Sequence, residues 1–215
     1  MNSSVTSEHP LSNAEVVSLT GRMLGAIFYY SPDKADVAPI IDLLSHDGWA
    51  TEWPCGDIVD VQQVALLIRS GLESENRQTL DEAYQRLFIG PDALPAPPWG
   101  SVYLDHESVI FGDSTLALRR WQSTLGIEVQ QQQREPEDHI GLLLMLAAWL
   151  AESRPEQITP LLAEHLLPWS GRFLTLLDEK AQHPFYQGIA RLTRLTLDDW
   201  QRCYSPLVVG KELFF

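Results

Sequence analysis

Apolar residues recur along this chain at steps of three and four, the spacing that places them on one face of an α-helix. Two segments, beginning at Ser12 and Thr79, carry a hydroxyl residue followed three positions later by glutamate, a pattern that caps the first turn of a helix. The spacing predicts helices that begin near Ser12, Asp36, Thr79 and Pro160, and helices over residues 58–72, 113–125, 169–181 and 184–203.

The predicted buried face of the first helix consists of Val16, Leu19, Met23, Ile27 and Tyr30. No stretch that alternates apolar and polar residues is long enough to predict a strand. We therefore expect an all-α fold, a single globular helical bundle of about eight to ten helices over residues 13–215. A flexible segment is expected over residues 1–12.

One connection, residues 90–108 (GPDALPAPPWGSVYLDHES), interrupts the helical pattern with four prolines and two glycines. Connections of this length inside a compact domain are usually functional or disordered. This one carries Trp99, Tyr103 and other apolar side chains, which a disordered segment rarely has. It either lines a groove or plugs the core, and the sequence leaves both open.

A second unusual segment, residues 135–151, begins with EPEDH and continues with twelve almost uninterrupted apolar residues. The run is shorter than the roughly 18 to 20 residues of a membrane span, so it predicts a buried central helix. We expect Glu135 or the residue before it to cap this helix and Pro136 to occupy its first position. Glu137 and Asp138 would then complement the positive end of the helix dipole and leave a charged, partly exposed rim.

His139 is less well explained by helix structure, and a structural and a functional role both stay open. Adjacent residues on a helix point about 100° apart, so Asp138 and His139 cannot form an orienting pair with each other. The chain contains no GxSxG, HExxH, GxGxxG or GxxxxGK[ST] motif. We expect no catalytic residue, no cofactor and no metal site, with a hydrolase or nucleotide-dependent protein that uses His139 as the alternative.

The net charge of −14, from 29 acidic and 15 basic residues, narrows the choice of partners. Such a chain repels nucleic acid phosphates and anionic membrane surfaces and attracts basic partners. Its two cysteines, Cys55 and Cys203, form neither a disulfide framework nor a zinc motif. With no export-signal pattern at residues 1–18, we expect a cytoplasmic protein without nucleic acid binding or membrane insertion.

Several ordered blocks resemble one family. They are GAIFYYSP at 25–32, YQRLFIGP at 84–91, PAPPWGSVYLD at 95–105, SVIFGDSTLALR at 108–119, EPEDHIGLLLMLAAWL at 135–150, LLPWSGRFL at 166–174 and HPFYQGIARLTRLTLDDW at 183–200. In these blocks the chain resembles the DmsD-type members of the TorD/DmsD/NarJ group of redox-enzyme maturation chaperones. The resemblance implies an all-helical, cytoplasmic, non-enzymatic protein that binds the twin-arginine signal peptide of a molybdenum-cofactor reductase precursor and delays export until the cofactor is loaded.

The DmsD-type blocks further imply that the client is the catalytic subunit of dimethyl sulfoxide reductase or a close paralogue. A chaperone of the same fold for a nitrate or trimethylamine oxide reductase is the alternative. Components of the twin-arginine translocase are further candidate partners.

The resemblance assigns signal-peptide binding to Tyr29, Tyr84, Leu87, Phe88, Pro98, Trp99, Tyr103, Asp138 and His139, with Gly112, Glu135 and Pro136 as structural neighbours of the site. From helical spacing alone, Tyr84, Leu87 and Phe88 fit the core equally well. Tyr84, Tyr103 and Asp92 stand where the resemblance leads us to expect tryptophan. The change at Asp92 loses apolar area and adds charge, which puts that contact in doubt.

Overall fold

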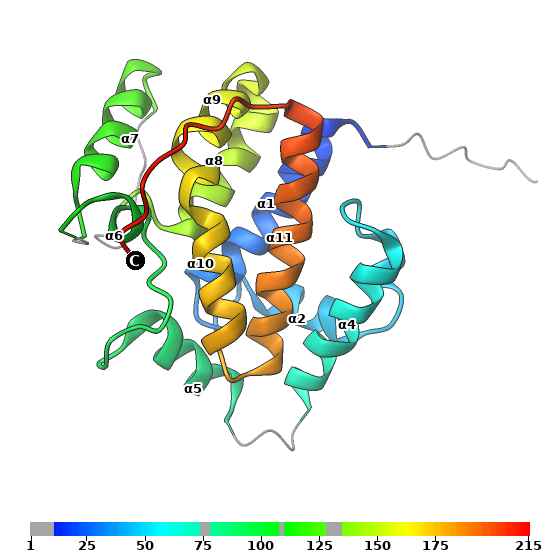
Figure 1. Cartoon of the computed structure of the whole chain (residues 1–215). Helices are drawn as coiled ribbons and strands as arrows, with labels where there is room; N and C mark the ends of the chain where they lie inside the picture. The colour runs from blue at the N-terminus through cyan, green and yellow to red at the C-terminus, as the bar shows by residue number, and fades with distance from the viewer. Residues whose placement is uncertain (1–10, 74–77, 108–109, 128–134) are drawn as a thin grey trace, which may run out of the picture.

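A computed structural model describes residues 11–73, 78–107, 110–127 and 135–215 (Figure 1). Its helices are α1 (Asn13–Tyr29), α2 (Ala38–Ser45), α3 (Trp49–Glu52), α4 (Ile58–Leu72), α5 (Leu80–Tyr84), α6 (Gly100–Leu104), α7 (Asp113–Thr124), α8 (Ile140–Ser153), α9 (Ile158–Pro160), α10 (Leu167–Lys180) and α11 (Pro184–Tyr204). Shorter turns follow α5 (Gln85–Ile89), precede α9 (Pro155–Gln157) and follow α9 (Leu161–Leu166). Residues 1–10 of the predicted flexible segment 1–12 lie outside the described residues.

The all-α prediction is confirmed: in the described ranges the sole extended pairing is one isolated bridge between Trp99 and His139. Both predicted capping boxes form, at Ser12 and at Thr79. The helix expected from Pro160 was placed too late, because helical backbone already begins at Pro155 and continues through α9 into α10. Part of the proline-rich connection is also helical, because α6 forms within it.

The buried face of α1 agrees only in part with the predicted one: Ile27 is buried, and Val16 and Tyr30 pack against the core. Leu19 is 44% exposed, whereas Val17, Leu24 and Phe28 are buried. The helix is rotated relative to the prediction because Gly21 and Gly25 lie against the backbone of α8. A Cβ atom added to Gly25 would lie 2.8 Å from the carbonyl oxygen of Gly141 on α8, so the two backbones approach too closely for any side chain.

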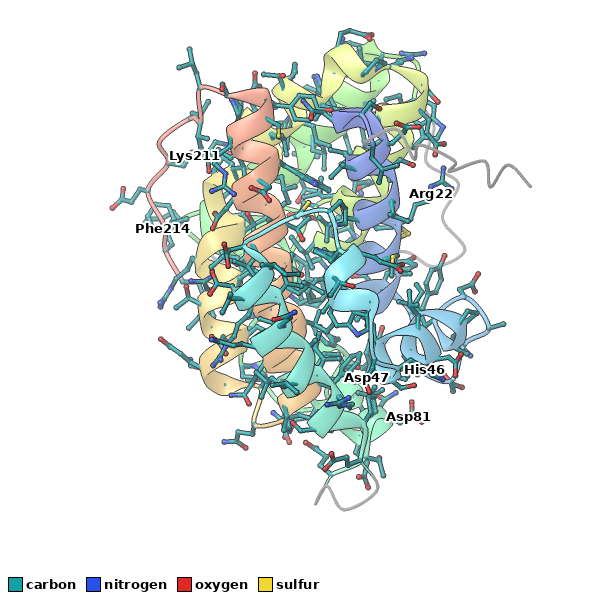
Figure 2. All side chains as sticks on the ribbon, turned by 90° about the vertical axis from the view of Figure 1, so that its right-hand side faces the viewer. Arg22, His46, Asp47, Asp81, Lys211 and Phe214 are labelled. Carbon is teal, nitrogen blue, oxygen red and sulfur yellow. The ribbon has the colours of Figure 1, made fainter. Side chains whose placement is uncertain are left out.

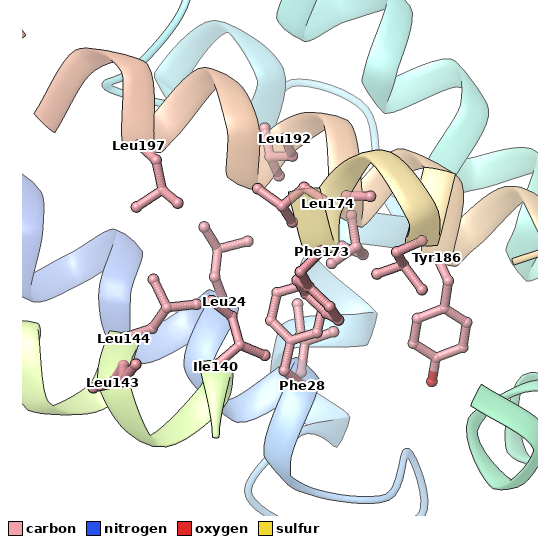
Figure 3. Close-up of a cluster of buried hydrophobic side chains, with 14 of the residues drawn as sticks. Leu24, Phe28, Ile140, Leu143, Leu144, Phe173, Leu174, Tyr186, Leu192 and Leu197 are labelled. Atoms are coloured by element: carbon pink, nitrogen blue, oxygen red, sulfur yellow. The ribbon is translucent and has the colours of Figure 1, made fainter. Parts of the chain in front are cut away.

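Four helices enclose the main core, which Figure 3 shows in close-up. The side chains labelled there are Leu24 and Phe28 on α1, Ile140, Leu143 and Leu144 on α8, Phe173 and Leu174 on α10, and Tyr186, Leu192 and Leu197 on α11. The predicted central helix is therefore confirmed as a core element. No helix within the described part of the chain is both long enough and apolar enough to cross a membrane.

The remaining helices flank this core on two sides (Figure 1). On one side α4 packs against α11 and carries α2 and α3. On the other side α6 contacts α7 and α10. Residues 206–215, the segment after α11, run back in extended form past α10 to α6 (Figure 1). We call residues 206–215 the strap.

The close approach of α1 and α8 predicts that Gly25→Ala destabilises the protein. The new methyl group would meet the Gly141 carbonyl and the Met145 side chain, so the helices must separate. We expect a loss of roughly 1–3 kcal/mol in the free energy of unfolding, measured by urea denaturation. Gly171→Ala on α10 is the matched control, because its Cβ would meet nothing within 4 Å. It should leave stability unchanged or raise it by up to about 1 kcal/mol; equal curves for Gly25→Ala and the wild type would contradict the packing argument.

Candidate functional site

The proline-rich connection and the residues before α8 are joined by a short antiparallel contact centred on Trp99 and His139. The main-chain N–H of Gly100 donates to the carbonyl of Asp138 over 3.1 Å. We call this contact, residues 98–101 with residues 138–141, the clasp. It connects two segments almost forty positions apart in the sequence and fixes the start of α6 beside the start of α8.

The clasp explains why α8 begins later than predicted. The N–H of Ile140 donates to the carbonyl of Pro98 over 2.8 Å, and His139 keeps an extended backbone with ψ of 131°. Residues 135–138 therefore precede the helix, and the prediction that residues 135–136 cap and open it is wrong. His139 is the cap: its Nδ1 accepts a hydrogen bond of 3.0 Å from the N–H of Gly141.

Asp138 caps the neighbouring helix instead of its own. Its Oδ2 accepts a hydrogen bond of 2.6 Å from the N–H of Ser101 in the first turn of α6. The side chain is only 3% exposed, and burial raises its pKa, opposed by the hydrogen bonds from Ser101 and Thr115. The expected exposed rim is thus wrong for Asp138. Glu137 forms an ion pair of 2.6 Å with Arg119.

His139 is a neutral, buried ring. Burial lowers its pKa to about 3, and the bond from Gly141 occupies Nδ1, so the remaining proton sits on Nε2. Its ring packs edge-on against Tyr29 at 5.6 Å and against Trp99 at 6.2 Å between ring centroids. A general base needs a pKa near the working pH and access to substrate, so this geometry opposes the alternative in which His139 performs acid–base chemistry.

Trp99, Tyr29 and Glu135 form the partly exposed side of this cluster. The indole Nε1 of Trp99 donates to a carboxylate oxygen of Glu135, which fixes the ring and the carboxylate together. Burial raises the pKa of Glu135, the hydrogen bond from Trp99 lowers it, and the charge of Asp138 raises it again. Burial and the charge of Glu135 also raise the pKa of Tyr29. The result is an aromatic surface with one accessible carboxylate.

Comparison with known proteins bears on this arrangement. The family model described as "Nitrate reductase delta subunit" matches residues 58–175. The chain is 52% identical to the Tat proofreading chaperone DmsD of Salmonella paratyphi A, over 92% of this chain and 95% of the relative. It is 49% identical to the probable Tat proofreading chaperone DmsD of Haemophilus influenzae, over 86% and 90%. It is also 32% identical to the chaperone protein YcdY of Escherichia coli, over 82% and 89%.

The chain belongs to the DmsD-type redox-enzyme maturation chaperones. The resemblance drawn from the sequence blocks is confirmed at the level of the family. The placement of the individual site residues follows from the structure.

Besides Asp138 and His139, five of the predicted site residues are buried inside this DmsD-type fold, and one of them is Pro98 in the clasp. Tyr84, Leu87, Phe88 and Tyr103 are 4%, 0%, 4% and 0% exposed. The hydroxyl of Tyr84 donates to the carbonyl of Tyr29 over 2.8 Å, so this side chain supports the partly exposed ring from beneath. Tyr103 stacks on Trp169 with ring centroids 5.5 Å apart. These residues shape the site from within and do not form its surface.

Gly112 lies at the cap position of α7, where the helix has no side-chain cap of its own. A Cβ atom there would lie 2.1 Å from Oδ2 of Asp105. That carboxylate accepts hydrogen bonds from the N–H and the hydroxyl of Ser114, at 3.2 Å and 2.7 Å, so it supplies the missing cap. Sequence spacing did not indicate Asp105 as a cap, because α7, the helix that it caps, begins only after an intervening segment.

A hollow of about 450 Å³ lies beside Gly90 and Asp92. Asp81, Glu82 and Asp92 contribute three carboxylates to its wall, against one guanidinium from Arg86. The exposed Asp92 thus belongs to an acidic surface. Among the described residues, these three carboxylates included, no group of three or more His, Cys, Asp or Glu side chains is arranged to hold a metal ion.

The buried state of His139 predicts a specific acid sensitivity. The unfolded side chain binds a proton below about pH 6.5, whereas the folded one does so only near a pKa of about 3. Because the unfolded state holds more protons in this window, the free energy of unfolding falls as pH falls, by up to about 1.4 kcal/mol per pH unit. His139→Asn keeps a cap acceptor and removes the titration, so its stability should fall less steeply between pH 6.5 and 4.

The control for this measurement is His46→Asn, which changes an exposed histidine. Its stability curve should run parallel to that of the wild type. Parallel curves for His139→Asn as well would show that the ring is not buried neutral in solution.

Asp138 should behave as the cap of α6. Asp138→Ala removes the acceptor for the Ser101 N–H, so we expect a loss of roughly 1–2 kcal/mol in the free energy of unfolding. Asp138→Asn retains an acceptor oxygen and removes the buried charge, so its loss should be smaller. Thermal denaturation of both variants at pH 7 measures the difference, and a more stable alanine variant would rule out the cap.

Proposed function

We propose that this chain binds the twin-arginine leader of a molybdoenzyme precursor, the catalytic subunit of dimethyl sulfoxide reductase or a close paralogue, and delays export until the cofactor is loaded. The observation that carries the proposal is the partly exposed aromatic surface of Trp99 and Tyr29 with Glu135 held on it. Membership of a family whose relatives are named Tat proofreading chaperones supports the choice of partner.

The chemistry of a twin-arginine leader fits such a surface. Guanidinium groups pair with carboxylates through two parallel hydrogen bonds and stack on aromatic faces. Glu135 is the carboxylate of the clasp region best suited to this, because Glu137 is paired with Arg119 and Asp138 is buried. The apolar part of the leader requires an apolar groove, which aromatic side chains beside the clasp can line.

Long-range charge supports the same partner. The net charge of −14 attracts a cationic peptide and accelerates its association at low salt. Burial raises the pKa of Tyr84, and the negative charges of Glu135 and Asp33 raise it further. The acidic hollow at Asp81 and Asp92 extends this negative surface.

The function needs no chemical step. Holding back a precursor requires only that the bound leader be inaccessible to the export machinery, and the cytoplasm is the compartment in which the precursor is made. The protein acts there as a non-enzymatic binding partner. Asp92 is the residue that bears on client choice, because it adds a charge to the hollow where the resemblance leads us to expect tryptophan. A panel of leaders from dimethyl sulfoxide, nitrate and trimethylamine oxide reductases separates these clients.

The proposal predicts that Glu135→Gln weakens leader binding by about tenfold or more, since a hydrogen bond to a charged group contributes about 1.5–3 kcal/mol. Glutamine still offers an oxygen to the Trp99 indole, so the ring should stay in place. The measurement is isothermal titration calorimetry with a synthetic dimethyl sulfoxide reductase leader, and with its twin-lysine version beside it.

Glu137→Gln is the matched control, because it loses the same charge from a carboxylate that Arg119 already occupies. Its affinity for the leader should change less than twofold to threefold. Equal losses of leader affinity in both variants would show that the overall negative charge, and not a specific contact with Glu135, attracts the leader. Absence of wild-type binding to every leader in the panel would overturn the proposed function.

A further inference from the structure

The strap crosses the molecule beside the clasp, and Figure 2 shows Lys211 and Phe214 along its course. Two of its N–H groups donate to main-chain carbonyls of the helical body. Val209 donates to Ala163 over 3.0 Å, and Phe214 donates to Tyr103 on α6 over 2.9 Å. Arg172 on α10 donates to the carbonyl of Phe215 over 3.1 Å. The strap is thus held as a bound extended peptide is held, through its backbone.

The side chains of the strap are poorly buried for such a segment. Leu207, Val209, Leu213, Phe214 and Phe215 are 92%, 43%, 40%, 38% and 40% exposed. Leu207 is almost fully exposed, and the other four leave more than a third of their surface in water, so the strap is less firmly anchored than the core helices, whose apolar side chains are almost completely buried. A segment held by a few backbone hydrogen bonds at its edge opens at lower free energy than the core does. The strap is therefore a weakly held occupant of its groove.

The groove beneath the strap is aromatic. Tyr103, stacked on Trp169, lies under the end of the strap and meets the ring of Phe215 edge-on at 5.5 Å between centroids. The ring of Phe214 lies against His106 at 5.4 Å. An apolar peptide that displaced the strap would find two carbonyl acceptors, those of Ala163 and Tyr103, already placed for its backbone.

A small polar cavity opens on the same groove. Its volume is about 10 Å³, and its walls include Asp138, Glu164, His165 and Lys211. His165 contributes a buried Nε2 that has no hydrogen-bond partner. Lys211, whose ammonium group donates to the carbonyl of Glu164 over 3.2 Å, is the cation at this cavity. Buried polar atoms are rarely left without a partner, so this imidazole nitrogen is available to a polar group of a bound peptide.

We propose that the strap occupies, in the free protein, the groove that binds the apolar part of the leader, so that the leader must displace it. The sequence of the strap supports this, because Lys211-Glu-Leu-Phe-Phe215 places a cation ahead of three apolar residues. A twin-arginine leader has the same order, a basic segment followed by an apolar one. The inference rests on the proposed function, to which it adds an internal competitor.

The test compares leader binding to the full chain and to a chain that ends at Pro206. Removing an internal competitor raises the fraction of molecules that can bind, so the apparent affinity should rise at least threefold in calorimetry. A peptide of sequence VVGKELFF, added to the shortened chain, should bind it and weaken its apparent affinity for the leader. Unchanged or weaker leader binding to a shortened chain that melts as the wild type does would overturn the proposal.

Point variants guard against misfolding of the shortened chain. Val209→Pro combined with Phe214→Pro removes both N–H donors at full length and should also strengthen leader binding. Lys211→Ala should strengthen it more than Lys34→Ala, which loses the same charge from an exposed site between α1 and α2. Equal changes in leader affinity for the two lysine variants, or no gain in affinity for the double proline variant, would contradict the proposal that the strap competes with the leader.

The outcomes also separate this proposal from the proposed function. A leader that binds the full and the shortened chain equally well overturns the strap proposal and leaves the function standing. A leader that binds neither chain overturns the function, and the strap proposal with it.

Discussion

The clasp is the contact on which the functional side of the molecule depends. Main-chain hydrogen bonds join Pro98 and Gly100 to residues 138–140, so the proline-rich connection is fixed to the start of the central helix. This pairing forces His139 out of the helix and turns the Asp138 carboxylate toward α6. The residues of the clasp therefore fix the first turns of both α6 and α8. The partly exposed side of the clasp is the aromatic surface at Trp99.

Polar groups around the clasp serve structure first and recognition second. The buried pair at residues 138–139 satisfies N–H groups that would otherwise lack partners, which accounts for a carboxylate and an imidazole in an apolar setting. In the proposed function, Glu135 and the rings of Trp99 and Tyr29, which are partly exposed, bind the leader. The strap contacts α6 at Tyr103, and its Lys211 lines the small cavity to whose wall the buried Asp138 also belongs.

Much of the fold could be predicted because local patterns control it. Helices α4 and α11 begin and end within a residue of the predicted ranges, since caps and apolar spacing act over a few positions. The rotation of α1 and the late start of α8 could not be predicted in this way. Both follow from contacts between distant segments: Gly25 with Gly141, and Pro98 with Ile140. The predicted site residues come from family resemblance, and helical spacing left Tyr84, Leu87 and Phe88 open between the core and the binding surface. A motif does not distinguish a ring at the surface from one beneath it, so the structure was needed to show that these side chains are buried.

Hydrogen–deuterium exchange of the full chain, with and without a dimethyl sulfoxide reductase leader, tests the central claim most directly. The account predicts slower exchange with the leader in residues 95–104, around the clasp and α6. It also predicts faster exchange at the N–H groups of Val209 and Phe214 as the strap is released. Protection confined to the opposite side, at α2 to α4, would contradict the account and place leader binding elsewhere on the molecule.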